Sequence, residues 1–380
     1  MKRYLSNAVL SDLGKKMVML TGPRQVGKTT LAKEMMASYR RPQYLNWDVA
    51  EDRSILMTQS WSLRADLLVF DEIHKMSHWK EYLKGVFDGR VDGQATLVTG
   101  SARMETFRQS GESLAGRYFL ARLHPFSVRE WVELTDAKPE EALDRLMERG
   151  GLPEPFLAED LVLAERWRQQ YFTDLVREDV LEFSRIQEIK AMRLLVELLR
   201  KRVGSPLSIA SLARGLQIAP NTVARYLDIL EALYVIFLVR PFHRNIARAI
   251  LKEPKVYFFD TAYVIGDEGV KWENACAAML LKHVHFEQDI LGKSTSLHYL
   301  RTKEGAEVDF VLCENDAPVR LIECKHANNH NNHPAPSLIK FAKLFPEAES
   351  IQLVRELRQE EYRRPVSIVK GAEWLAELSA

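Results

Sequence analysis

The sequence has little cysteine and almost no net charge. The three cysteines, Cys276, Cys313 and Cys324, include no CxxC pair. This argues against a disulfide framework or a cysteine-rich zinc module and favours a reducing cytoplasm. Lysine and arginine number 53 and aspartate and glutamate 52, which gives a formal net charge of +1. A basic coat over the whole chain is therefore excluded, and any surface for nucleic acid must be a local patch.

Long apolar runs are also missing. The longest lies near residues 229–239, is interrupted by Glu231, and is far shorter than the roughly 20 residues that a membrane span needs. The N-terminal stretch has no uninterrupted apolar core, so we expect neither a signal peptide nor a membrane partner. Apolar residues make up 46% and charged residues 28% of the 380 residues. That composition is typical of a folded globular chain, and at about 150 residues per domain the length predicts two to three domains.

Short apolar runs alternate with helical patterns in the first third of the chain. Strands are expected at residues 17–20, 43–47, 67–70 and 95–99, with helices at 29–39 and 79–88. This alternation predicts a parallel sheet with helices on its faces. From about residue 137 to 202, apolar residues recur at three- and four-residue spacing, which predicts helices.

The rest of the chain mixes both patterns. Residues 204–240 have the order helix, tight turn, helix and strand, which is the layout of a winged helix-turn-helix. Strands are expected again at residues 256–260, 296–300, 307–312, 319–325 and 350–354.

The clearest motif is the string GPRQVGKT, which fits GxxxxGK[ST] and stands between an expected strand and an expected helix. Its glycines allow the backbone to wrap phosphates, and the loop amides together with the helix N-terminus supply partial positive charge. We expect Lys28 to reach the β- and γ-phosphates of ATP and the Thr29 hydroxyl to ligate Mg²⁺. The predicted nucleotide-binding residues of this loop are Gly22, Pro23, Arg24, Gln25, Val26, Gly27, Lys28, Thr29 and Thr30.

Acidic and polar residues follow two later apolar strands. In LLVFDEIHK, Asp71 is expected to hold Mg²⁺, directly or through water, and Glu72 to activate or orient the attacking water. The alternative is an ordinary acidic strand end. In ATLVTGSARM, Thr99 or Ser101 is expected to contact the γ-phosphate or that water, with a plain turn as the alternative.

Two arginines are candidates for neutralising charge in the transition state of ATP hydrolysis. Arg117 follows a glycine in ESLAGRY, and Arg103 lies further upstream. A guanidinium suits this role because it spreads its charge over several donors. Arg117 is compatible with action in its own subunit or in a neighbour's, and a solvated surface arginine is the alternative.

The segment from residue 221 to 255 is the candidate surface for nucleic acid. Asn221, Thr222 and Arg225 are expected on the exposed N-terminal face of the second helix of the helix-turn-helix, where such side chains contact phosphates or base edges. Arg240, Arg244, Arg248 and Lys252 then recur every four residues, and residues 240–255 carry five basic side chains and one acidic side chain, a local charge of 5 − 1 = +4. The alternatives are a protein-packing module and a solvated charged face.

A second candidate site lies in the last third. Asp309 is in the expected strand EVDFVL, and Glu323 and Lys325 follow in VRLIECK. Glu323 and Lys325 are two residues apart, so on a strand both point to the same face, and Asp309 on the neighbouring strand of a hairpin can lie beside them. Two carboxylates can bind Mg²⁺ or Mn²⁺ through oxygen, while Lys325 positions water or neutralises charge. Such a constellation is what metal-assisted cleavage of a phosphodiester needs, and an ordinary surface hairpin, which often satisfies the same pattern, is the alternative.

These strings resemble a known family. TGPRQVGKTTL, YLNWD, LLVFDEIHK, TGSA, SLAGR and HPFSVREW are similar to a prokaryotic AAA-type ATPase family whose members carry a C-terminal domain that resembles PD-(D/E)xK nucleases. The later strings RYLDILEALYVIFLVRPFHRN, PKVYFFDTAYV, WENAC, EVDFVL and IECK extend the resemblance over nearly the whole chain.

The resemblance implies an α/β chain in four parts. These are an AAA-type ATPase core with a parallel P-loop sheet at 1–136, a helical lid or linker at 137–203, a winged helix-turn-helix at 204–245 and a PD-(D/E)xK nuclease-like domain at 246–380. It further implies that Glu273, in the helical segment WENACAAML, adds a third carboxylate beside Asp309 and Glu323.

Three functions are compatible with these features. The leading interpretation is a cytoplasmic Mg-ATP-dependent ATPase coupled to a nuclease-like domain that acts on nucleic acid, with DNA favoured over RNA and homo-oligomerisation possible. The second is a nucleotide-gated switch or adapter whose C-terminal domain binds DNA or a protein without cleavage. The third is a transcription regulator that uses the winged helix to bind duplex DNA.

Overall fold

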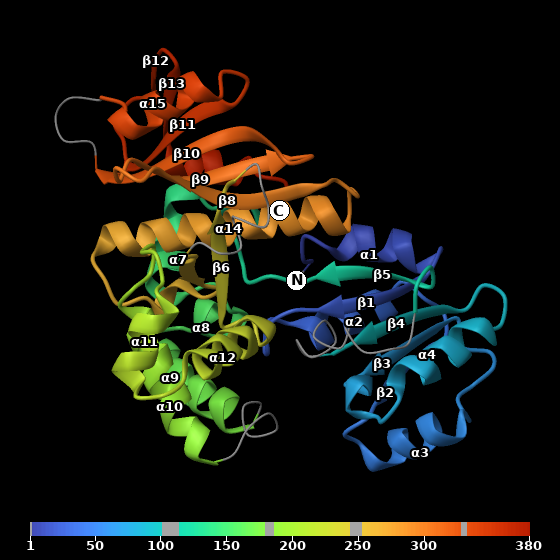
Figure 1. Ribbon diagram of the computed structural model, residues 1–380. Coiled ribbons are helices and arrows are strands. Elements are labelled where there is room, and N and C mark those ends of the chain that lie inside the picture. The colour runs from blue at the N-terminus through green and yellow to red at the C-terminus, as the bar shows by residue number, and fades with distance from the viewer. Residues whose placement is uncertain (1, 101–113, 179–185, 244–252, 328–332) are drawn as a thin grey trace. The chain divides into compact units, whose positions relative to one another are not determined.

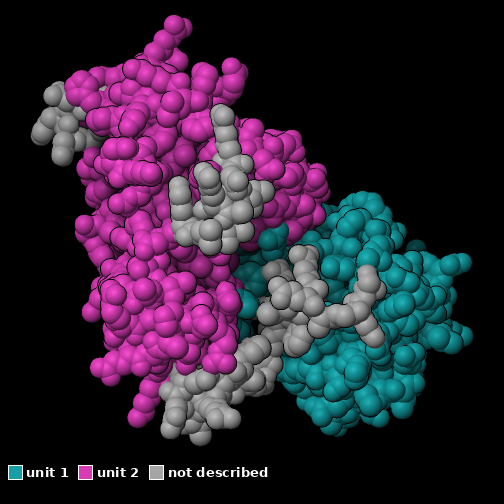
Figure 2. Space-filling model, in the orientation of Figure 1, with its two compact units in different colours: residues 1–124, 232–234 teal, residues 125–231, 235–380 magenta. Residues whose placement is uncertain are grey.

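The computed structural model describes residues 2–100, 114–178, 186–243, 253–327 and 333–380. It divides the chain into two compact units, which Figure 2 shows in teal and magenta. The first unit comprises Met1–His124 and Ala232–Tyr234, and the second comprises Pro125–Glu231 and Val235–Ala380. Within the described ranges, none of the helices is long and apolar enough to cross a membrane.

The first unit is built on a five-stranded parallel sheet with the order β2-β3-β4-β1-β5 (Figure 1). The strands are β1 (Met17–Thr21), β2 (Pro42–Asn46), β3 (Leu67–Asp71), β4 (Ala95–Thr99) and β5 (Tyr118–Arg122). The connecting helices are α1 (Ser6–Leu13), α2 (Lys28–Met36), α3 (Ala50–Thr58), the 3₁₀ helix η1 (Ile73–Lys75) and α4 (Trp79–Asp88). The parallel sheet predicted for this region is confirmed, and α1, α3 and β5 are additions to it.

Helices cover both faces of this sheet, which is why its central strands are apolar along their whole length. Met17 and Met19 of β1 point to a face where Leu83 of α4 and Leu56 of α3 complete the core. The alternate residues Val18 and Leu20 are equally buried and point to the face that α1 and α2 cover. All five strands run in the same direction, so their carboxyl ends meet at one edge of the sheet.

The second unit begins with a helical region, as the spacing of its apolar residues predicts. Its helices are α6 (Val128–Thr135), α7 (Pro139–Arg149), α8 (Pro153–Leu157), α9 (Leu161–Glu178), α10 (Ile186–Arg200), α11 (Ile209–Leu216) and α12 (Pro220–Ala232). Ser208 caps α11 by accepting a hydrogen bond from the Ser211 amide, and a left-handed Gln217 ends it. Val223, Tyr226, Leu227 and Leu230 of α12 are buried, so its opposite face is left to solvent.

An eight-stranded mixed sheet completes the second unit, in the order β12-β13-β11-β10-β9-β8-β6-β7. The strands are β6 (Ile236–Pro241), β7 (Lys255–Phe258), β8 (Thr295–Arg301), β9 (Glu307–Glu314), β10 (Ala317–Ala327), β11 (Glu349–Glu356), β12 (Glu361–Arg363) and β13 (Val366–Lys370). β6 follows the helix pair as expected, but it pairs with β7 and β8 and so belongs to this sheet.

Helices pack on both faces of the mixed sheet. α14 (Glu268–Asp289) runs along one face and α15 (Pro336–Leu344) along the other, as Figure 1 shows. Leu338 and Phe341 of α15 pack on Val311 of β9 and Leu321 of β10. The 3₁₀ helix η3 (Thr261–Tyr263) leads into α14, and α16 (Gly371–Ala376) ends the chain against α6 and α7.

Candidate functional site

The phosphate loop joins the carboxyl end of β1 to the first residue of α2, as the motif predicts. Gly22 has a φ of +144°, and a Cβ there would lie 2.2 Å from the carbonyl oxygen of Leu123. Gly27 immediately precedes α2 with a φ of 98°. Only glycine adopts these conformations without strain and tolerates so close a neighbour. The two glycines of the motif are therefore required by the backbone path of the loop.

The Lys28 ammonium points into its own loop. It donates hydrogen bonds to the carbonyl oxygens of Gly22 at 3.0 Å and Pro23 at 2.7 Å. The side chain is buried at the start of α2, where the amides of the first helical turn also point. A cation and several N–H donors therefore converge on the concave side of one short loop.

Asp71 gathers hydroxyl groups from three neighbouring elements. Its Oδ2 accepts hydrogen bonds from Thr29 Oγ1 at 2.9 Å and from the Tyr44 hydroxyl at 2.5 Å. Its Oδ1 accepts one from Thr99. β3 lies between β2 and β4 in the sheet, so residues at the carboxyl ends of these strands meet here. The structure therefore brings Asp71, Thr29 and Thr99 together beside the phosphate loop, as the sequence predicts.

Tyr44 is the member of this group that sequence reasoning missed. Burial and the hydrogen bond to Asp71 raise the pKa of Tyr44 well above its ordinary value, so the phenol keeps its proton and donates it. The signal in the sequence was a tyrosine on a strand next to the acidic strand, which is too common a feature to single out.

The geometry at Asp71 fits a magnesium ion. A carboxylate and a hydroxyl 2.9 Å apart offer two hard oxygen ligands, and Mg²⁺ is usually held in proteins by one or two carboxylates together with substrate phosphates and water. Thr29 and Asp71 are therefore the residues that would hold Mg²⁺ on a bound nucleotide.

Glu72 stands next to Asp71 in a constrained position. Its backbone is left-handed, with a φ of 57°, which is uncommon for a residue other than glycine. Its amide donates to the Thr99 carbonyl at 3.0 Å. The carboxylate lies 3.5 Å from the Lys75 ammonium and 3.6 Å from the His74 ring. Burial raises the pKa of Glu72, which brings a carboxylate closer to the range of a useful proton acceptor.

The structure describes only one of the two arginines that are candidates for neutralising charge in the transition state. Ser101 and Arg103 lie outside the described residues. Arg117 precedes β5, and its carbonyl accepts a hydrogen bond from Met17 at the start of β1. The phosphate loop follows the other end of β1, so Arg117 is a full strand length away from the loop of its own chain. Its guanidinium forms two hydrogen bonds with Asp88, at 2.8 and 3.0 Å. Action within its own subunit is therefore not supported, and action in a neighbour's site stays a prediction.

The C-terminal acidic residues form a cluster on the second unit. Asp309 of β9 accepts a hydrogen bond from the Cys324 amide of β10 at 2.9 Å. Glu323 of β10 pairs with Lys325 at 2.6 Å. Glu273 of α14 accepts a hydrogen bond from the Tyr257 hydroxyl at 2.7 Å. The predicted residues therefore do converge from α14, β9 and β10.

Lys255 lies inside this cluster, and sequence reasoning missed it. Its ammonium is 2.6 Å from Glu307, 3.2 Å from Glu273 and 3.7 Å from Asp309. The side chain is only 1% exposed. Burial opposes its charge, but Glu273, Asp309 and Glu307 together raise the pKa of Lys255 above its ordinary value. The carboxylates thus surround a buried, protonated amine.

The two predicted glutamates of the metal site share one electrostatic feature. Burial and the nearby charge of Asp309 raise the pKa of both Glu273 and Glu323 to about 7. Across the described ranges, no group of three or more histidine, cysteine, aspartate or glutamate side chains is arranged to hold a metal ion. The predicted ligands instead form ion pairs: Glu273 and Asp309 with the ammonium group of Lys255, and Glu323 with that of Lys325. In this arrangement they do not fit a divalent cation.

The predicted surface for nucleic acid is described only in part. Asn221 and Arg225 are exposed on α12 and Thr222 is half-buried, as expected for the solvent face of that helix. The Arg225 guanidinium lies over the ring of Tyr226, 5.7 Å from its centre. Arg244, Arg248 and Lys252 fall between β6 and β7 in the sequence and lie outside the described residues.

Three family models match consecutive segments of the chain. The "AAA domain" model matches residues 14–132. The "Domain of unknown function (DUF8612)" matches residues 140–266, and the "Domain of unknown function (DUF4143)" matches residues 268–372. The first unit therefore carries a nucleotide-binding AAA domain of the P-loop type, in agreement with the loop geometry.

Relatives that align with more than three quarters of this chain extend this result. The uncharacterized protein Rv2008c of Mycobacterium tuberculosis is 30% identical over 311 residues, which cover 78% of this chain and 67% of that protein. The chain belongs to the same family as Rv2008c. Another relative, the uncharacterized protein MJ1544 of Methanocaldococcus jannaschii, is 22% identical over 329 residues, 78% of this chain and 72% of that protein.

Among solved structures, the chain is similar to the RuvB Holliday junction branch migration motor of Thermotoga maritima. The similarity covers 61% of this chain and 86% of that chain, with 20% identity and a TM-score of 0.32. A similarity this weak assigns no function to the Rv2008c family.

Proposed function

We propose that the protein binds Mg-ATP in the loop from Gly22 to Thr30 and hydrolyses it. The contact between Thr29 and Asp71 is the observation that supports this most directly, because a hydroxyl and a carboxylate 2.9 Å apart beside the loop could both serve as oxygen ligands of Mg²⁺. Lys28 would exchange the carbonyls of its own loop for the β- and γ-phosphates. Glu72 would orient the attacking water and accept its proton, with Thr99 holding Asp71 in place.

Two variants test this proposal. Lys28→Ala should abolish ATP binding, because it removes the buried ammonium from the loop. Glu72→Gln should bind ATP but turn it over far more slowly, since the amide cannot accept the proton of the water. ATP binding is measured by calorimetry and hydrolysis by phosphate release, with the exposed Lys15→Ala as the matched control. Wild-type turnover in Glu72→Gln would show that another residue activates the water.

The ATPase core is proposed to act with the rest of the chain on nucleic acid. In this proposal, residues 1–136 would form the core, 137–203 a helical lid, 204–245 a helix-turn-helix whose final strand, β6, joins the eight-stranded sheet, and 246–380 a nuclease-like domain of a cytoplasmic protein. The exposed face of α12 and the basic side chains between β6 and β7 would contact DNA phosphates. Replacing Arg244, Arg248 and Lys252 together by glutamate should weaken DNA binding and flatten its salt dependence. An unchanged salt slope would identify this segment as a solvated face.

A second function is favoured by Lys255. Cleavage needs a metal among Asp309, Glu323 and Glu273, but an ammonium already neutralises two of these carboxylates. The arrangement therefore favours a nucleotide-gated switch or adapter whose C-terminal domain binds DNA or a protein without cleaving it.

One experiment separates the two functions. The protein is incubated with single- and double-stranded DNA and RNA in Mg²⁺ or Mn²⁺, with and without ATP, and cleavage and ATP hydrolysis are followed in parallel. Metal-dependent cleavage that disappears in Asp309→Ala, while ATPase activity stays intact, would support the nuclease. Binding without cleavage in every condition would support the adapter.

A further inference from the structure

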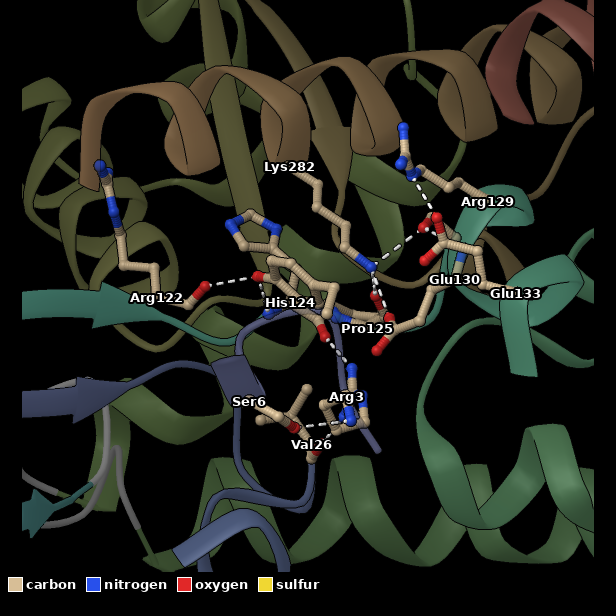
Figure 3. Close-up of polar contacts among 12 residues, drawn as sticks. Arg3, Ser6, Val26, Arg122, His124, Pro125, Arg129, Glu130, Glu133 and Lys282 are labelled. Atoms are coloured by element: carbon tan, nitrogen blue, oxygen red, sulfur yellow. Dashed lines mark hydrogen bonds and ion pairs between the residues drawn. The ribbon is translucent and has the colours of Figure 1, made fainter. Parts of the chain in front are cut away.

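Arg3 connects the phosphate loop to the end of the β5 strand within the first unit. Its guanidinium donates one hydrogen bond to the carbonyl oxygen of Val26, at 2.7 Å, and another to that of His124, at 2.6 Å (Figure 3). Val26 lies inside the phosphate loop, and His124 is the last residue of the first unit before the chain continues into the second. Arg3 is 7% exposed, so both bonds are shielded from water.

Further hydrogen bonds fix residues 122–124 at the end of β5. The Tyr4 hydroxyl donates to the Arg122 carbonyl at 2.6 Å and accepts from the His124 amide at 3.1 Å. The Leu123 amide donates to the Thr21 carbonyl at 2.8 Å. Gly22 packs directly on the Leu123 carbonyl, so the start of the phosphate loop is in contact with the residues that follow β5.

The next residue of the chain is anchored in the second unit. The Lys282 ammonium of α14 donates to the Pro125 carbonyl at 3.2 Å, to Ser127 Oγ at 3.0 Å and to Glu130 at 2.6 Å (Figure 3). Residues 125–132 are matched by the AAA domain model, yet they pack in the second unit. The consecutive carbonyls of His124 and Pro125 are thus each held by a buried cation, one from each unit.

In the proposed function, nucleotide binding changes the contacts of this loop. Lys28 now donates to the carbonyls of Gly22 and Pro23, and in the proposed function it leaves them for the phosphates. The freed carbonyls would need new partners, and a shift of the loop backbone, including Val26, is one way to supply them.

We propose that Arg3 is a positioning residue that passes this shift from Val26 to His124, and through the peptide bond to Pro125 into α6 and α14. The inference rests on the proposed ATP binding. An arginine suits the task because its planar guanidinium presents several donors at fixed spacing and can hold two carbonyls together, whereas a lysine offers a single point of charge.

The test is hydrogen exchange of the full chain with and without Mg-ATP. In the wild type, ATP should change the protection of peptides covering residues 125–135 and 275–289. Arg3→Lys should still bind ATP but lose this change, and Tyr4→Phe, a milder variant that removes one hydroxyl, should reduce it. The neighbouring exposed residue provides the control, Lys2→Ala, which should behave as the wild type does.

The possible results distinguish a failure of the proposed ATP binding from a failure of the inference about Arg3. If calorimetry detects no ATP binding by the wild type, the proposed function is overturned and this inference with it. If the wild type binds ATP without a change at residues 125–135, the inference alone is overturned. It is also overturned if both Arg3→Lys and Tyr4→Phe keep the full wild-type change.

Discussion

Replacing Lys282 by methionine should destabilise the second unit strongly. The ammonium and the Glu130 carboxylate are 2.6 Å apart, with side chains 2% and 0% exposed. Removing one partner of a buried ion pair leaves the other charge without its counter-ion and costs about 3–5 kcal/mol. The substitution keeps most of the side-chain volume, so the loss would come from the charge and from the hydrogen bonds to Pro125 and Ser127.

Urea unfolding followed by tryptophan fluorescence measures this loss. Trp131, one of seven tryptophans, lies on α6 directly after Glu130 and contributes to this signal. The matched control is Lys293→Met, which breaks a 2.8 Å pair with Glu287 whose lysine is 41% exposed and which should cost about 1 kcal/mol or less.

The double variant Lys282→Met/Glu130→Leu completes the test. Without either charge in the core, it should recover most of the stability lost by Lys282→Met alone, because a buried ion pair can be replaced by apolar side chains at little cost. A loss below about 1 kcal/mol in the single variant, or a double variant as unstable as the single one, would refute the assignment of a buried, charged pair.

Two further predictions concern Glu231 and Arg117. Burial raises the pKa of Glu231 from its ordinary value near 4.5 to about 7, so the folded state binds the proton more tightly than the unfolded chain. The free energy of unfolding should therefore fall as the pH rises from about 4.5 to about 7, and Glu231→Gln should lower this slope in urea titrations across the range; an unchanged slope would contradict it. Arg117→Ala should leave the ATP dissociation constant unchanged in calorimetry, because the guanidinium pairs with Asp88 at the far end of the strand from the loop. If it acts in a neighbour's site, the variant should lose ATPase activity that rises with protein concentration in the wild type.

The parts of the fold that the sequence predicted depend on local signals. The phosphate loop is set by Gly22 and Gly27, whose conformations other residues avoid, and its motif is contiguous. The strands before Asp71 and Thr99 are short apolar runs that end in a polar residue, so their carboxyl ends could be aligned without knowing the structure.

The parts that were missed depend on contacts between distant segments. Tyr44 and Arg3 are each defined by a partner more than 20 residues away, and no local pattern marks either. β6 looked like the end of a winged helix because its own residues predict only a strand. Its neighbours in the sheet are β7 and β8. These strands begin only after a further 13 and 53 residues of the chain (255 − 242 and 295 − 242), so the residues of β6 alone do not indicate the pairing.

Lys255 shows why charge patterns alone misjudged the C-terminal domain. In the sequence it ends the basic segment 240–255, which predicts an exposed surface for nucleic acid or a solvated charged face, since lysine is seldom fully buried. A buried ammonium is stable only with carboxylates around it, and Glu273, Glu307 and Asp309 provide them. Two of them, Glu273 and Asp309, are also predicted ligands of the divalent metal. A metal bound by Glu273 and Asp309 would have to compete with this amine, which is covalently tethered 3.2 Å from Glu273 and 3.7 Å from Asp309.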